Sequence, residues 1–154
     1  MIVVECYLDE YLIRSLGFPK KLIKHQSGKG KVIRSLLRLQ GKIGIIDEDP
    51  DSIQPPELKN YDVILETENL RLLERKSSKN QYLIVISPTL EGWIVKRAIH
   101  NRIDLNDYGL ESDANSLHNI PHIEEKINFR NFLNYLVNKD EEIDILKSWL
   151  SKYL

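Results

Sequence analysis

In the segment Ile43-Gly44-Ile45-Ile46-Asp47-Glu48-Asp49, an apolar run ends in carboxylates. The chain opens on a shorter form of the same pattern, Ile2-Val3-Val4-Glu5. Short apolar runs of this kind are typical of buried strands. In open α/β sheets, ligands gather outside the carboxyl ends of parallel strands, and carboxylate oxygens there suit Mg²⁺ or Mn²⁺. The two stretches therefore predict a divalent metal site.

Strand and helix patterns alternate in the first half of the chain, which favours βαβ units and a mostly parallel sheet. We predict strands at residues 2–5, 21–25, 42–46, 61–65, 70–75 and 81–86, the last two joined as a hairpin by the turn at residues 76–80. A first helix ends at Gly17, and a second runs from Val32 to Gln40 and ends at Gly41. Ser87 and Pro88 suit the N-cap and the first position of a helix over residues 88–102. Residues 104–122 are predicted to be an irregular loop, followed by helices around residues 128–138 and 140–153.

The expected fold is thus α/β, with a mostly parallel central sheet flanked by helices and with further helices at the C-terminus. A chain of 154 residues, 42% hydrophobic and 29% charged, is typical of one globular domain. Residues 1–103 would form its metal-binding core, and residues 104–154 a loop and helical extension of the same domain. The apolar N-terminus lacks the features of a secretory signal, and no stretch approaches the ~20 apolar residues that span a bilayer, so we expect a cytoplasmic protein without a membrane partner.

Charge is distributed unevenly, although the formal net charge is only −1. Residues 11–46 contain no acid and nine Lys or Arg residues, whereas residues 47–68 are mostly acidic. This separation can place a phosphate-attracting surface beside a metal site, and the alternative is two solvated faces of opposite sign. Lys29 and Lys31, on a predicted turn at residues 27–31, are candidates to bind phosphate. The turn lacks the glycine spacing of a Walker A loop, which argues against hydrolysis of nucleoside triphosphates.

Each acid has a functional and a structural interpretation. Asp47 and Asp49 should lie on the same side of an extended segment, with Glu48 on the other side. Glu5 and Asp9 converge only if the turn between strand and helix is tight. Glu91, in the first helical turn, is favoured by the helix dipole even without a metal.

Other chemical residues carry weaker signals. Cys6 is the single cysteine, which excludes an internal disulfide and a Cys-based zinc site, and we expect it to pack rather than to act as a nucleophile. His118 and His122 flank Pro121, so they should not share a helical face as metal ligands. His25, beside the basic turn, either contacts phosphate or is an ordinary histidine. Trp93 and Trp149 are expected to be buried.

Taken together, the segment from Val3 to Glu10, the two helices around a Gly-Lys turn, and Ile43 to Asp49 resemble a toprim domain over roughly residues 1–100. The resemblance implies that Glu5 is the family's N-terminal glutamate and that Asp47 and Asp49 form its Asp-x-Asp metal motif. Asp9 matches a further acid of the toprim nucleases of the overcoming-lysogenisation-defect class. Ser87-Pro88-Thr89-Leu90-Glu91 is similar to their later Pro-x-x-(Ile/Leu)-Glu segment, and Lys96 lies where such enzymes supply a basic residue. Two glycines of the pattern are replaced, one by Cys6 and one by Pro50-Asp51.

By this resemblance the protein is expected to be a Mg²⁺- or Mn²⁺-dependent nuclease that cleaves DNA or RNA, with a role in phage defence or in nucleic-acid processing. The catalytic residues would be Glu5, Asp47, Asp49 and Lys96, and the metal ligands Glu5, Asp9, Asp47, Asp49 and Glu91. A topoisomerase would need a separate tyrosine domain and a primase usually a zinc module, which this chain does not provide. Toprim nucleases of bacterial defence often act with an ABC-type ATPase, so a separately encoded ATPase is an expected partner, and a homo-oligomer stays open.

Two alternatives remain. The first is a catalytically silent or partner-activated binding protein that docks on an ATPase, which exposed Trp149, Tyr153 or Leu154 on the terminal helices would favour. The second is a phosphoacceptor receiver domain. That class places an acid pair after the first strand and a lone Asp after the third, whereas here the pair follows the third.

Overall fold

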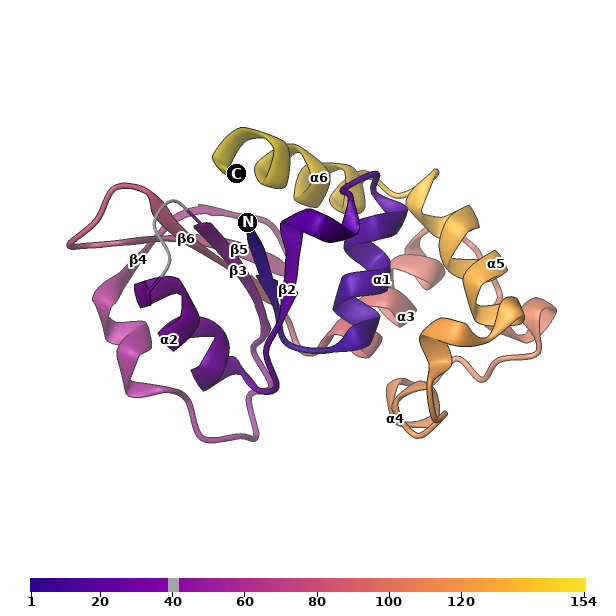
Figure 1. Cartoon of the computed structure of the whole chain (residues 1–154). Coiled ribbons are helices and arrows are strands. Elements are labelled where there is room, and N and C mark those ends of the chain that lie inside the picture. The colour runs from indigo at the N-terminus through magenta and orange to yellow at the C-terminus, as the bar shows by residue number, and fades with distance from the viewer. Residues whose placement is uncertain (39–41) are drawn as a thin grey trace.

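A six-stranded sheet runs through the protein, seen in a computed structural model that describes residues 1–38 and 42–154 (Figure 1). The strand order is β2-β1-β3-β6-β5-β4. The first four strands in this order are parallel, and β5 and β4 continue the sheet in antiparallel fashion. The strands are β1 (Ile2–Val4), β2 (Ile23–His25), β3 (Lys42–Asp47), β4 (Tyr61–Glu66), β5 (Leu70–Arg75) and β6 (Gln81–Ile86). The predicted α/β class with a mostly parallel sheet is confirmed.

The helices cover the two faces of the sheet unequally. One face is covered by α2 (Lys29–Arg38), and the other helices lie on the opposite side (Figure 1). These are α1 (Tyr7–Ser15), α3 (Leu90–His100), α4 (Ala114–His118), α5 (Ile127–Val137) and α6 (Glu141–Tyr153). Short 3₁₀ helices span Lys20–Leu22, Pro56–Asn60, Leu105–Tyr108 and Ile123–Glu125. None of the helices in the described residues is long and apolar enough to cross a membrane.

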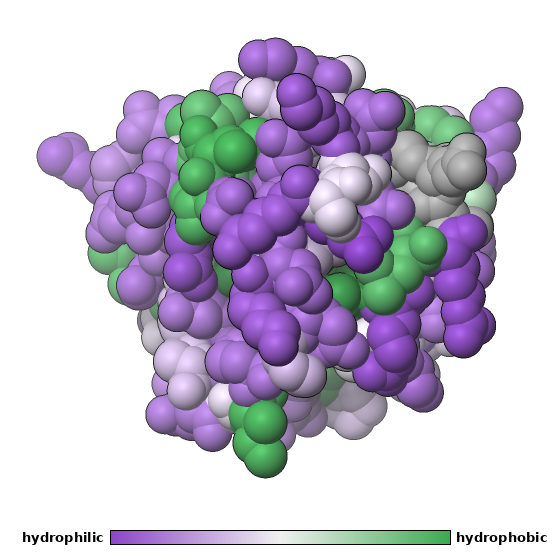
Figure 2. Space-filling view, turned by 90° about the vertical axis from the view of Figure 1, so that its left-hand side faces the viewer, coloured by the Kyte–Doolittle hydropathy of each residue, from purple (hydrophilic) through white to green (hydrophobic). Residues whose placement is uncertain are grey.

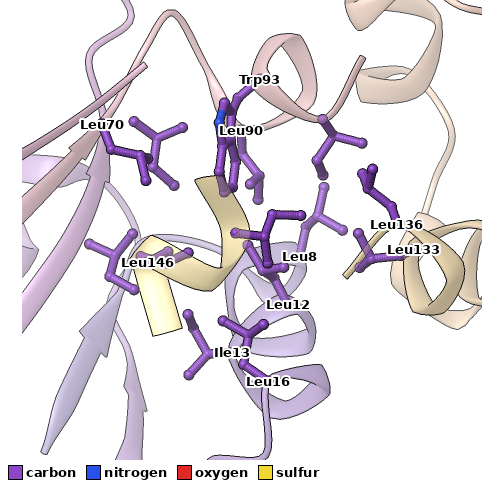
Figure 3. Packing of buried hydrophobic residues seen from close by; sticks show 14 of the residues in the cluster. Leu8, Leu12, Ile13, Leu16, Leu70, Leu90, Trp93, Leu133, Leu136 and Leu146 are labelled. Carbon is purple, nitrogen blue, oxygen red and sulfur yellow. The ribbon is translucent and has the colours of Figure 1, made fainter. Parts of the chain in front are cut away.

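Alternation along β1 explains the two layers. Ile2 and Val4 belong to the larger hydrophobic cluster with α1, α3, α5 and α6, whereas Val3 belongs to a smaller cluster with α2. Successive side chains of a strand point to opposite faces, so a fully apolar strand is buried on both sides. Figure 3 shows the larger cluster, in which Leu8, Trp93 and Leu133 come from three different helices. Helices beyond residue 104 thus share one core with the sheet.

Gly44 lets α2 approach the sheet closely. A Cβ atom at this position of β3 would lie 2.9 Å from methyl carbons of Leu36 and Leu83. Since a side chain would occupy space already filled by the helix, glycine at this point of an otherwise apolar strand has a packing reason.

A buried ion pair joins α3 to the start of α6. Asp140, fully buried, accepts hydrogen bonds from Arg97 Nε at 2.8 Å and from Asn101 Nδ2 at 2.7 Å. Its second oxygen caps α6 by accepting from the backbone N–H of Ile143 at 2.9 Å. The same carboxylate therefore neutralises a buried guanidinium and satisfies a helix end.

The outer edge of the sheet has a different character. On β4, Val63, Ile64 and Leu65 are all exposed, and the pairing with β5 shifts register between Val63 and Leu65. The strand therefore presents apolar side chains and free backbone groups to solvent at a bulge.

Most predicted elements are present, with four corrections. The second strand is shorter, because Lys20–Leu22 forms a 3₁₀ turn. Helix α2 begins at Lys29, so Lys29 and Lys31 lie on a helix and not on a turn. Helix α3 is capped by Thr89, whose Oγ1 accepts from Gly92 N at 3.1 Å, and not by Ser87. The predicted loop at residues 104–122 contains α4. The predicted helix end at residues 40 and 41 lies outside the described residues.

Candidate active site

The strand order places a crevice at the carboxyl ends of β1 and β3. From β1 the chain crosses through α1 to β2 on one side, and then through α2 to β3 on the other side. In open α/β sheets, ligands bind outside the carboxyl ends of the strands at such a switch point. Glu5 directly follows β1, and Asp47 is the last residue of β3. The two acids singled out from the sequence therefore flank the position where the topology alone predicts a ligand.

A cavity of about 380 Å³ lies at this point and is called the acidic pocket below. All five carboxylates predicted as metal ligands line it, which are Glu5, Asp9, Asp47, Asp49 and Glu91, and so do Cys6, Thr89 and His118. They come from the ends of β1 and β3 and from the first turns of α1 and α3, with His118 supplied by α4. Segments distant in sequence thus contribute negative charge to one cavity.

Asp47 has a carboxylate oxygen without a partner. Its Oδ1 atom is buried, and within the described part of the chain it accepts no hydrogen bond. Burial, together with the charges of Asp9, Glu5 and Glu91, raises the pKa of Asp47 to about 8. An unsatisfied buried oxygen is costly, and a bound cation would satisfy it.

Glu5 is held by the neighbouring backbone. Its Oε2 accepts a hydrogen bond from Asp47 N at 3.2 Å. Burial raises the pKa of Glu5, although the backbone N–H groups of Asp47 and Lys29 oppose this effect. The end of β1 and the end of β3 are therefore connected through one carboxylate.

Asp9 has a structural role that the sequence interpretation did not include. Its Oδ2 accepts from Cys6 N at 2.9 Å and from Glu5 N at 3.1 Å, while Cys6 Sγ accepts from Asp9 N at 3.4 Å. This reciprocal pair is a capping box at the start of α1. Burial raises the pKa of Asp9 to about 7. Asp9 thus shapes the tight turn, and a ligand role for it stays a prediction.

Cys6 is not a packing residue, contrary to expectation. It is exposed and serves as the N-cap of α1. Desolvation at the pocket and the Asp9 carboxylate raise the pKa of its thiol, which disfavours a thiolate nucleophile.

Asp47 and Asp49 line the same pocket and Glu48 does not, as expected, although β3 ends at Asp47 and the segment is not extended at Asp49. Asp49 lines the acidic pocket with Asp47, and its backbone has φ 44° and donates to Pro88 O at 2.7 Å. Glu48 is absent from the pocket lining, accepts from Ser87 Oγ, and forms an ion pair with Arg71 at 3.4 Å. The middle acid of the motif is therefore a structural residue.

His118 is a pocket residue that sequence reasoning missed. Its Nδ1 lies 3.0 Å from Glu91 Oε1, across 27 positions of sequence. The sequence offered no signal for this pairing, because the only regular spacing of His118 was to His122, and α4 was not predicted.

Three predicted basic residues lie elsewhere. Lys29 Nζ donates to Glu48 O at 2.9 Å and to Ser52 Oγ at 2.6 Å, so it ties down the loop after β3. Lys31 donates to Ser27 Oγ at 3.0 Å and lines a different cavity. Lys96 is exposed on α3 and does not line the acidic pocket. Lys29 still lies close enough to Glu5 for its backbone N–H and its charge to lower the pKa of that carboxyl against the effect of burial, but none of the three lysines lines the acidic pocket.

The acids of the pocket are not drawn into a tight cage. Within residues 1–38 and 42–154, one group of three side chains has ligand atoms all within 4.8 Å of one another, namely His122, Glu124 and Glu125, outside the acidic pocket. Mg²⁺ usually keeps several waters and binds through one or two carboxylates. The wider spacing therefore fits a hydrated ion better than a fully protein-ligated one.

No protein-family model, curated protein or solved structure matches the chain. The residues and geometry of the acidic pocket therefore carry the functional argument.

Proposed function

We propose that this protein is a toprim-type, metal-dependent nuclease that hydrolyses phosphodiester bonds of DNA or RNA. The observation that carries the proposal is the unpartnered Oδ1 of Asp47, buried in a cavity lined by four further carboxylates. Such a site gathers carboxylates around a buried oxygen that accepts no hydrogen bond within the described residues, which is the chemistry expected of a divalent cation site.

Glu5, Asp47 and Asp49 would hold Mg²⁺ or Mn²⁺, and Glu91 and Asp9 lie in the same cavity for a second ion. A bound ion supplies a water of lowered pKa and neutralises charge on the leaving oxygen. The placement of Glu5 after β1 and of Asp47 and Asp49 after β3 also agrees with the toprim resemblance.

The chain's own residues prepare the site for a phosphodiester. The N-termini of α1 and α3 both lie at the acidic pocket, because Cys6 and Thr89 are their N-caps and line it. Partial positive charge at these helix ends attracts phosphate oxygens. Glu91 holds the His118 ring through its contact with Nδ1. The other ring nitrogen, Nε2, would then exchange a proton with the leaving oxygen.

The test is Mn²⁺ and Mg²⁺ titration by calorimetry, with cleavage of plasmid DNA and structured RNA scored in parallel. The Asp47→Asn/Asp49→Asn variant should lose both metal binding and cleavage. Asp51→Asn/Glu68→Gln, which removes two charges from exposed side chains outside the pocket, should retain both. Absence of metal binding by the wild type, or equal loss in both variants, would overturn the proposal.

The alternative is a partner-activated or silent toprim-like protein that docks on an ATPase. Its sequence argument is borne out in part. Trp149 is 7% exposed and Tyr153 packs against Tyr82 with ring centroids 4.7 Å apart, whereas Leu154 is 39% exposed. Metal binding without cleavage would favour this alternative. The receiver domain is less compatible, since that class has a fully parallel sheet, and here β4 and β5 are antiparallel.

A further inference from the structure

A second cavity, of about 360 Å³, lies between β2 and α2 and is called the basic pocket. Its charged lining consists of Lys24, Lys31, Arg34 and Arg38, with Gln26 and Ser35 beside them. Among these cations, Arg34 forms an ion pair within the described residues, with Glu57 Oε1 3.9 Å from its Nη1. Lys24 and Arg38 make no ion pair within the described residues. The cations are thus largely uncompensated.

The four cations of the basic pocket all belong to residues 11–46, the segment that contains no acid. Figure 2 shows that the side of the molecule that carries α2 is covered mainly by hydrophilic side chains, with separate apolar patches. Four cations around one concave surface form a place where anions concentrate. A backbone of repeated phosphates fits this chemistry, because each Lys or Arg can neutralise one phosphate.

An aromatic pair connects the basic pocket to the acidic pocket. Tyr7 and His25 are stacked, with ring centroids 4.4 Å apart and an angle of 11° between the planes. Tyr7 follows Cys6, which lines the acidic pocket, and His25 precedes Gln26, which lines the basic pocket. Because Tyr7 is 58% exposed, its ring is a stacking surface between the two cavities.

We infer that the substrate is an unpaired nucleic-acid strand, which places phosphates in the basic pocket, a base on the Tyr7–His25 pair and the scissile phosphodiester in the acidic pocket. The inference rests on the proposed nuclease function and specifies its substrate class. Stacking on an aromatic side chain requires an accessible base face. A continuous duplex keeps its base faces against neighbouring bases, so it cannot use Tyr7.

The first test measures binding of a fluorescein-labelled 20-nucleotide single strand by fluorescence anisotropy. EDTA is present so that cleavage does not interfere. Single-stranded affinity varies with salt with a slope of about −0.7 per phosphate contact. Lys24→Ala/Arg38→Ala removes two contacts, so the slope should become shallower by about 1.4 and affinity should fall roughly 25-fold near 0.1 M salt. Lys79→Ala/Lys147→Ala removes the same charge from exposed positions outside both pockets and should leave the slope unchanged.

The second test concerns the stacking surface. Tyr7→Ala should weaken single-strand binding by roughly 5- to 150-fold, the range for loss of one stacked base. Tyr7→Phe keeps the ring and should bind like the wild type. Neither variant should alter binding of a blunt duplex of the same sequence. Deoxy- and ribo-oligonucleotides are tested in parallel, and the sugar that binds more tightly identifies the substrate.

The outcomes separate this inference from the proposed function. Metal-dependent cleavage with equal binding by the pocket and control variants would overturn the inference and leave the nuclease intact. Tighter binding of duplex than of single strand would also overturn it. Pocket-dependent and Tyr7-dependent binding of single strands would support the strand path, and a lack of cleavage in the same preparation would then count against the nuclease alone.

Discussion

The metal-free protein is expected to lose stability as pH rises through the neutral range, because of Asp47. Its folded-state pKa is about 8, against about 3.9 in the unfolded chain. Between these values the folded state binds a proton that the unfolded state does not bind. Stability from this group is therefore present at low pH and is lost as pH approaches the folded pKa.

The magnitude follows from proton linkage. One proton bound only by the folded state changes the unfolding free energy by about 1.4 kcal/mol per pH unit, so the loss from about pH 5 to pH 7 is about 3 kcal/mol. Urea unfolding in EDTA, followed by fluorescence of the buried Trp93 and Trp149, measures this slope. Asp9, whose folded-state pKa is about 7, adds to the same slope. Asp47→Asn, which cannot ionise, should therefore make the slope shallower by about 1.4 kcal/mol per pH unit without abolishing it, and should be more stable than the wild type above pH 7.

Unfolding free energies that rise from pH 5 to pH 7, or an Asp47→Asn variant with the same slope as the wild type, would refute this reasoning. Mn²⁺ provides an internal control, because carboxylate ligands must be deprotonated to bind metal. Stabilisation by saturating Mn²⁺ should therefore increase with pH in the wild type and be absent in Asp47→Asn.

Three further predictions concern packing and capping. Asp140→Ala leaves the buried Arg97 with only the exposed Glu141 carboxylate, 3.9 Å from its Nη2, and should cost about 3–5 kcal/mol of unfolding free energy. Glu141→Ala, at a side chain 78% exposed, should cost less than about 1 kcal/mol in the same urea titration. Gly44→Ala inserts a methyl group against Leu36 and Leu83 and should cost about 1–3 kcal/mol. By contrast, Gly30→Ala, within α2, should stabilise the protein by up to about 1 kcal/mol. Equal effects of the two glycine variants on the melting temperature would contradict the close approach of α2 to the sheet at Gly44. Thr89→Ala removes the cap of α3 and should cost about 0.5–2 kcal/mol, while Ser87→Ala should leave the helix content measured by circular dichroism unchanged.

The sequence was informative wherever one local pattern dominates. The strands at residues 70–75 and 81–86 were predicted to the residue because β-branched and leucine runs are interrupted only by a polar turn. Asp47 and Asp49 share the acidic pocket and Glu48 does not, as expected, although the segment is not extended at Asp49, where φ is 44°. Helices α5 and α6 followed from their apolar periodicity.

What the sequence could not provide depends on tertiary contacts. Both Ser87 and Thr89 are suitable N-caps, and only the structure shows that Thr89 takes this role. Lys29 appeared free for phosphate because its acceptors, Glu48 O and Ser52 Oγ, belong to a loop about twenty positions away. His118 reaches Glu91 only because α4 packs beside α3, and no periodic pattern encodes such a contact.

The two edges of the sheet have opposite consequences for self-association. At the β2 edge, cations such as Lys24 repel a second copy of the chain, as charged residues do on protected edge strands. At the β4 edge, three consecutive apolar side chains, Val63 to Leu65, are exposed beside unpaired backbone groups, and only the bulge interrupts a regular template. Edge-to-edge association of two copies would therefore begin at β4.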